Sequence, residues 1–229
     1  MIKIMIYNIM SIMGYMFTSE KENCNMGKIY VVLSCVNTGA GKLYRDLTGS
    51  DFDHVSVSFG EDLSVMYSFG RLRRDVPFVG GFVSEYPSRF LEGGGDVPIR
   101  VYTLDFEEDE YLRLRDIVRR MKTHPRIYTY NIFDKAATVV GGSFKIKRSY
   151  TDLSFVCRLL RLGNIRSYRE LSFVLSPYLT YEGTLNEKAE NSPEHHGAEY
   201  FENVSVGRAV ASTVAYGAKL IGRKIYDKL

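Results

Sequence analysis

Three side chains of this sequence could carry out chemistry: His54, Asp152 and Cys157. An imidazole can take up and return a proton near neutral pH, and a thiolate or a carboxylate can attack a carbonyl carbon. His54 lies at the start of residues 52–59, whose apolar pattern predicts a β-strand. Asp152 and Cys157 lie in a predicted helix that begins near residues 149–152 and ends at Leu162. Each also has a purely structural interpretation: a hydrogen-bonded histidine at a strand edge, a helix cap, and a small buried apolar residue.

The strand that carries His54 is predicted to pair with the segment after it. Side chains alternate along a strand, so His54 and the two serines that follow it lie on the opposite side from the valines. A short turn leads into residues 63–69, a second β pattern, so that residues 54–69 form a hairpin. Tyr67 or Ser68, on the return strand, could orient the imidazole ring.

The remaining elements predict an α+β fold, in which a small antiparallel sheet packs against helices. Residues 71–95 contain five glycines and two prolines. They are predicted to form a loop-rich excursion with a short extended piece near Phe82 and Val83, and such loops often border a site. Tyr130 and Asn131 precede a helix and could line a cleft. The other predicted elements are strands at 29–34 and 97–106 and helices at 42–47, from 107 to just before Pro125, at 131–140 and at 166–175.

Composition and motifs argue against several classes of function. The formal net charge of +3 over 229 residues gives no reason to expect nucleic-acid binding. The segment 39–42, Gly-Ala-Gly-Lys, lacks the spacing of a nucleotide-binding phosphate loop, and Leu43 stands where Ser or Thr would bind magnesium. His195 and His196 have no partners at metal-site spacing, so neither a metal nor an organic cofactor is expected. Three distant cysteines favour a reducing, cytoplasmic location.

Both ends of the chain differ from its middle. Residues 1–25 begin with an apolar run, which is either an extension preceding a natural start at Met26 or a weak membrane or packing segment. Residues 26–185 form the predicted domain, and the polar residues 186–203 form a linker. Residues 204–229 are predicted to form an amphipathic helix. This helix could dock on the core, self-associate through its small residues, or lie on an anionic membrane.

The order of these elements resembles the circularly permuted papain-like hydrolases, the NlpC-type superfamily, near its YiiX-like and lecithin–retinol acyltransferase-like branches. It is most similar to an uncharacterised bacterial group, mainly of Firmicutes. The resemblance covers about residues 26–185. The matching stretches are residues 28–34, 54–58, 66–71, 80–83, 128–131, 155–156 and 181–183.

The resemblance implies a cysteine at a helix N-terminus, acidified by the helix dipole and a nearby imidazolium, that attacks an amide or ester of a peptide or lipid-like acyl substrate. The histidine of the adjacent strand transfers the proton. In this sequence, however, Asp152 occupies the position of the nucleophile. Cys157 lies about 140° around the helix from Asp152 and about 7.5 Å further along its axis, so it should not reach that position.

Three interpretations follow from this mismatch. In the first, the helix start is shifted in register and Cys157 is the nucleophile of an active thiol hydrolase or acyltransferase, with His54 as its base. In the second, which the sequence favours, the domain is catalytically silent and keeps its cleft as a binding or interaction module; Asp152 then caps the helix or pairs with His54. In the third, Asp152 and His54 form a different active pair with a carboxylate nucleophile.

Overall fold

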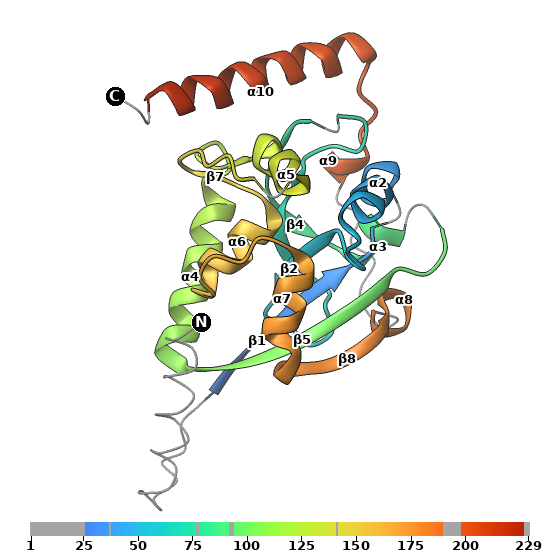
Figure 1. Ribbon diagram of the computed structural model, residues 1–229, viewed down its shortest axis with the longest axis vertical. Coiled ribbons are helices and arrows are strands. Elements are labelled where there is room, and N and C mark those ends of the chain that lie inside the picture. The colour runs from blue at the N-terminus through green and yellow to red at the C-terminus, as the bar shows by residue number, and fades with distance from the viewer. Residues whose placement is uncertain are drawn as a thin grey trace, which may run out of the picture.

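A six-stranded antiparallel sheet forms the centre of the protein in the computed structural model (Figure 1). The structure describes residues 26–36, 38–76, 78–91, 94–140, 142–189 and 198–226. The strand order is β4-β3-β2-β1-β5-β8, so the first strand of the chain lies inside the sheet. The strands are β1 (Met26–Ser34), β2 (His54–Ser58), β3 (Met66–Arg71), β4 (Gly80–Glu85), β5 (Pro98–Glu107) and β8 (Leu179–Thr184). A separate two-stranded parallel pair consists of β6 (Thr129–Tyr130) and β7 (Ser149–Tyr150).

Helices cover both faces of the sheet, and the alternation of side chains along the strands divides the core accordingly. Val31 and Val55 pack with α4 (Glu108–Thr123), α6 (Asp152–Leu159) and α7 (Tyr168–Leu175) on one face. On the other face, a smaller cluster joins the sheet to α3 (Pro87–Leu91) and α8 (Leu185–Lys188). Its buried members are Tyr30, Val32, Leu63, Met66, Phe90, Val97, Ile99, Val101, Leu185 and Ala189. A 3-10 turn, η1 (Ser176–Tyr178), joins α7 to β8.

The helix after β1, α2 (Gly39–Thr48), packs against the start of β2. Thr38 caps its first turn by accepting a hydrogen bond from the Gly41 amide, and Gly49 ends it in the left-handed conformation. A Cβ atom at Gly41 would lie 1.8 Å from a carboxylate oxygen of Asp53. The glycine therefore allows a close helix–strand approach, which is a packing role for the segment that contains Gly and Lys at 39–42.

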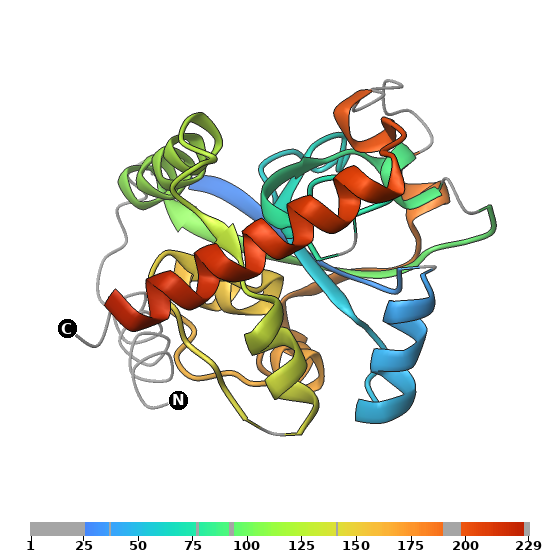
Figure 2. The same ribbon diagram turned by 90° about the horizontal axis from the view of Figure 1, so that it is seen from above.

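The C-terminal helix α10 (Val206–Tyr226) lies above α5 (Ile132–Val139) in Figure 1 and crosses in front of the sheet in Figure 2. The hydroxyl oxygen of Tyr216 lies 2.8 Å from the backbone oxygen of Gly80 and 2.6 Å from that of Tyr130, which share its single proton, and Leu220 is completely buried. A short helix, α9 (Ala198–Phe201), precedes it. The helix predicted at 204–229 is thus docked on the core along one side.

The predicted α+β class is confirmed, and so is the hairpin of β2 and β3. The excursion at 71–95 differs from the prediction, because residues 80–85 form a complete edge strand rather than a short extended piece. The polar linker at 186–203 is helical at both described ends, in α8 and α9. Residues 1–25, Pro77 and the histidines at 195 and 196 lie outside the described residues. Among the helices of the described ranges, none combines the length and the apolarity that crossing a membrane requires.

Candidate functional site

The imidazole of His54 is held between two carboxylates. Its Nε2 atom lies 2.9 Å from an oxygen of Glu85, and its Nδ1 atom lies 3.0 Å from an oxygen of Asp152. A carboxylate can only accept a hydrogen bond, so both ring nitrogens must carry a proton. Burial lowers the pKa of His54, but Glu85 and Asp152 outweigh burial and raise it to about 10. At neutral pH the side chain is therefore an imidazolium.

Asp152 belongs to the first turn of α6, where the helix dipole stabilises a negative charge. It does not cap the helix: Thr151 and Ser154 form a reciprocal capping box, with hydrogen bonds of 3.0 and 2.8 Å. The cap fixes the start of α6, which directs the Asp152 side chain at β2. Its Oδ2 atom accepts the backbone amide of Val55 at 3.1 Å.

Two further groups complete the buried cluster around Asp152. Tyr168 of α7 donates to its Oδ2 atom at 2.6 Å, and Lys135 of α5 lies 3.2 Å from its Oδ1 atom. Lys135 also donates to the Asp53 backbone oxygen at 2.9 Å and to the Tyr168 hydroxyl. Burial raises the pKa of Asp152, but Lys135 and His54 outweigh it and lower the pKa below its ordinary value. The carboxylate is therefore ionised and has hydrogen-bond partners at both oxygens.

Glu85, at the end of β4, holds the other side of the imidazole. It is buried, and a nitrogen of Arg89 lies 3.8 Å from its second oxygen. Burial raises the pKa of Glu85, whereas His54 and Arg89 lower it, so that the net pKa lies below the ordinary value. The ring of Phe90 covers the imidazole at a centroid distance of 5.8 Å.

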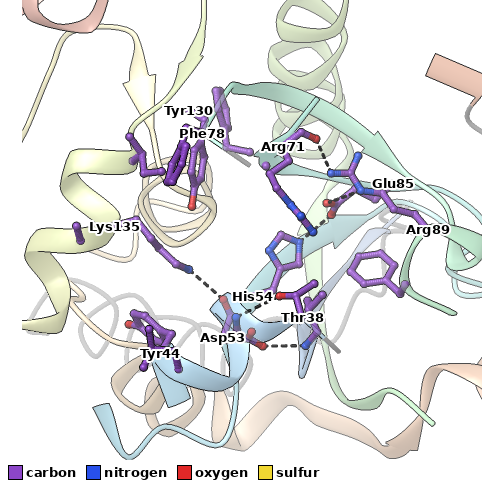
Figure 3. A pocket seen from close by; sticks show the side chains of 18 of the residues that line it. Thr38, Tyr44, Asp53, His54, Arg71, Phe78, Glu85, Arg89, Tyr130 and Lys135 are labelled. Atoms are coloured by element: carbon purple, nitrogen blue, oxygen red, sulfur yellow. Dashed lines mark hydrogen bonds and ion pairs between the residues drawn. The ribbon is translucent and has the colours of Figure 1, made fainter. Parts of the chain in front are cut away.

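His54, Glu85 and Lys135 of this cluster form the floor of a cavity of about 490 Å³, shown in Figure 3, and Asp152 and Tyr168 are not part of its lining. Strand β3 contributes Arg71, α5 contributes Lys135, and the segment before β4 contributes Phe78. The remaining wall is mainly apolar. Its nonpolar side chains include Val36, Leu43, Leu47, Phe69, Phe90, Ile132, Ala136 and Val139. A cavity of this size and lining is typical of small-molecule sites.

The structure brings His54 and Asp152 together and separates Cys157 from both. Cys157 is buried in α6 and lines a different cavity, next to Ser154 and Ile165. Burial raises the pKa of its thiol to about 12. Of the two cysteines within the described ranges, Cys35 and Cys157, neither lines the His54 cavity. A register shift that would bring Cys157 to the helix start is not present.

Of the four residues predicted to line the cleft or to orient the ring, Tyr130 does line the cavity. Tyr67 instead packs in the core, stacked on Phe82 at 6.2 Å, because its strand position faces the helices. Ser68 is buried within the sheet. Asn131 lines the second cavity, because its side chain caps α5 and donates to the Phe144 backbone oxygen. The side chains that orient the imidazole are Glu85 and Asp152.

Sequence reasoning missed Glu85, Lys135 and Tyr168. Glu85 follows a glycine pair that is typical of a loop, and Lys135 reaches the cluster only through its long side chain. Glu85 ends a strand and Arg89 lies in the following helix, so the four-residue spacing that pairs charges on one helix gave no signal for it. Across the described part of the chain, no group of three His, Cys, Asp or Glu residues could hold a metal ion.

In comparisons with family models, with curated proteins and with solved structures, no match to this chain was found. The chemistry of the site is therefore inferred from its own residues and their contacts. The site provides a permanently charged floor, apolar walls and a phenol, Tyr130, whose pKa is raised well above its ordinary value by burial.

The raised pKa of His54 makes stability depend on pH in a defined window. The unfolded chain loses this proton near the ordinary pKa of 6.5, whereas the folded chain keeps it up to about 10. The contribution of His54 to stability is fully present below 6.5 and is lost as the pH rises through this window. We expect the difference in free energy of unfolding between the wild type and His54→Gln to shrink between about pH 6 and about pH 9, as measured by urea denaturation. A difference that grows over this range would contradict the imidazolium assignment.

Proposed function

We propose that this protein is a binding module on a permuted papain-like fold, whose His54 cavity takes a ligand with an apolar body and forms no acyl-enzyme. The observation that carries the proposal is the position of His54 between two carboxylates. The element order and the N-terminus of α6, which points at His54, support the resemblance to that fold.

The geometry disfavours His54 as a general base. A base must offer an unprotonated nitrogen to the group that it deprotonates. Both nitrogens of His54 face carboxylate oxygens within 3.0 Å, and its pKa of about 10 keeps it protonated at neutral pH. A carboxylate nucleophile is equally disfavoured, because Asp152 is only 1% exposed and its Oδ2 atom accepts from Val55 and Tyr168.

The alternative is an active thiol hydrolase or acyltransferase with Cys157 as nucleophile. This would require an accessible thiolate near an imidazole. Burial raises the pKa of the Cys157 thiol to about 12. Cys157 lies in the second turn of α6 and lines the second cavity, not the cavity that contains His54. The described geometry supports the binding module over this alternative.

We expect the protein to bind methyl octanoate, an uncharged ester with an apolar acyl chain, without hydrolysing it. Binding would follow from burial of the chain against the apolar wall. NMR titration measures the binding, and chromatography of the mixture measures any released octanoate.

A matched pair of variants tests whether the cavity is the site. Ala136→Trp fills the cavity from an exposed position of α5, whereas Ala218→Trp adds the same side chain at an exposed position of α10 that is not part of the lining. We expect the first to abolish binding and the second to leave it unchanged. Release of octanoate by the wild type would refute the silent assignment.

Cys157 should react slowly with iodoacetamide near neutral pH, because a thiol with a raised pKa provides little thiolate. Peptide mapping by mass spectrometry measures the rate at each cysteine, and His54→Gln should not change the rate at Cys157. Fast labelling that disappears in His54→Gln would establish the thiol hydrolase instead.

A second role, association with an anionic membrane surface, is favoured by the outer side of α10. Five β-branched residues recur there at helical spacing, each between 55% and 80% exposed: Val206, Val210, Val214, Ile221 and Ile225. The described helix contains four basic residues and no acidic one: Arg208, Lys219, Arg223 and Lys224. An apolar stripe flanked by positive charge is typical of helices that lie in the membrane interface.

We expect the wild type to float with vesicles of phosphatidylcholine and phosphatidylserine but not with phosphatidylcholine alone. The double variant Val214→Glu, Ile221→Glu should lose this binding, because it places charge in the apolar stripe. Leu112→Glu, at an exposed position of α4, is the control. If the wild type is instead a dimer in sedimentation and the double variant a monomer, the stripe is a self-association surface and the membrane role fails.

A further inference from the structure

The charges around the His54 cavity do not balance. Asp53 pairs with Arg45 at 3.0 Å, so this pair is neutral. The two remaining carboxylates are Glu85 and Asp152, and they are shared among three cations: His54, Arg89 and Lys135.

A fourth cation, Arg71, has no carboxylate partner among the described residues. Its guanidinium donates to the Tyr200 hydroxyl at 3.3 Å and to the Arg74 backbone oxygen at 3.4 Å. The floor of the cavity therefore holds two more positive charges than carboxylates. Arg71 is partly buried, so an anion bound beside it would be less screened by water than one on the open surface.

Arg71 is placed to meet a ligand. It is the last residue of β3, and its side chain points into the cavity toward His54 (Figure 3). Its backbone oxygen accepts a 2.6 Å hydrogen bond from Arg89, which fixes the start of the side chain. A guanidinium presents a planar fork of donors that matches the two oxygens of a carboxylate.

The mouth of the cavity is apolar and exposed. Leu43, Leu47 and Phe78 line it and are 59%, 60% and 52% exposed. Large apolar side chains gathered at one cavity are typical of a ligand-binding surface. A ligand that contacts both these side chains and Arg71 must combine an apolar chain with an anionic head.

We propose that the cavity binds a monocarboxylic acid with an apolar chain, its carboxylate paired with Arg71 and its chain against Leu43, Leu47 and Phe78. This assignment rests on the proposed binding function and names its ligand class. A monoanion is assigned because His54, Arg89 and Lys135 already contact Glu85 or Asp152, which leaves Arg71 as the one cation of this group without a carboxylate partner among the described residues.

The test compares octanoate with its methyl ester on the full chain by titration calorimetry. Octanoate should bind about tenfold or more tightly than methyl octanoate, the factor that a hydrogen bond to a charged group supplies. Arg71→Gln should reduce the ratio of acid to ester affinity to about one, because it removes the charge that distinguishes the two compounds. Arg73→Gln is the matched control: it removes the same charge two residues further along the chain, but Arg73 is not part of the lining and pairs with Glu202 on the surface.

Each outcome decides between the two proposals. Equal binding of acid and ester would overturn the carboxylate assignment and leave the binding module intact, whereas no binding of either compound would overturn the binding module itself. Tighter binding of octyl phosphate than of octanoate would overturn the monoanion assignment. If Arg71→Gln does not fold, the ratio of acid to ester affinity in the wild type still decides.

Discussion

The buried imidazolium of His54 is the interaction on which the rest of the site depends. It joins Glu85 of β4 to Asp152 of α6, two residues that lie far apart in the chain. A charge inside a protein is tolerated only when partners compensate the loss of water, so each of the three groups requires the other two. Lys135 and Tyr168 attach α5 and α7 to the same cluster. One cluster of charged and hydrogen-bonded side chains thus joins five elements: β2, β4, α5, α6 and α7.

Local features of the fold serve this cluster. The capping box of Thr151 and Ser154 frees Asp152 from capping its own helix, so that its carboxylate can reach Val55 and His54. The hydroxyl of Tyr216 holds the backbones of Gly80 and Tyr130 together, which positions the start of β4 against β6. A Cβ atom at Gly80 would lie 2.6 Å from Tyr130, so only glycine permits this approach. The C-terminal helix therefore supports the cavity wall.

Alternation and helix signals in the sequence were sufficient to predict much of this arrangement. They separated His54 from the valines of its strand, paired β2 with β3, and located the start of α6. Glu85 was missed because Gly80 and Gly81, which suggest a loop, begin an edge strand whose pairing is set by tertiary contacts. Lys135 was missed because helix periodicity predicts which face of a helix a residue occupies, but not that a long side chain extends to Asp152 on another helix. Asn131 was misplaced because a local backbone cap competed with the cleft for its side chain.

The residue at the N-terminus of α6 determines whether this kind of site could catalyse a reaction or only bind a ligand. Such an N-terminus stabilises an anion of either kind, a thiolate or a carboxylate. A thiolate would react and then regenerate, and its neighbouring histidine would have to change protonation state in each cycle. Asp152 stays ionised and buried, so it keeps His54 charged throughout the neutral range. In the proposed binding function, an aspartate at this helix start keeps the cavity positively charged across the neutral range, and this charge favours binding of an anion.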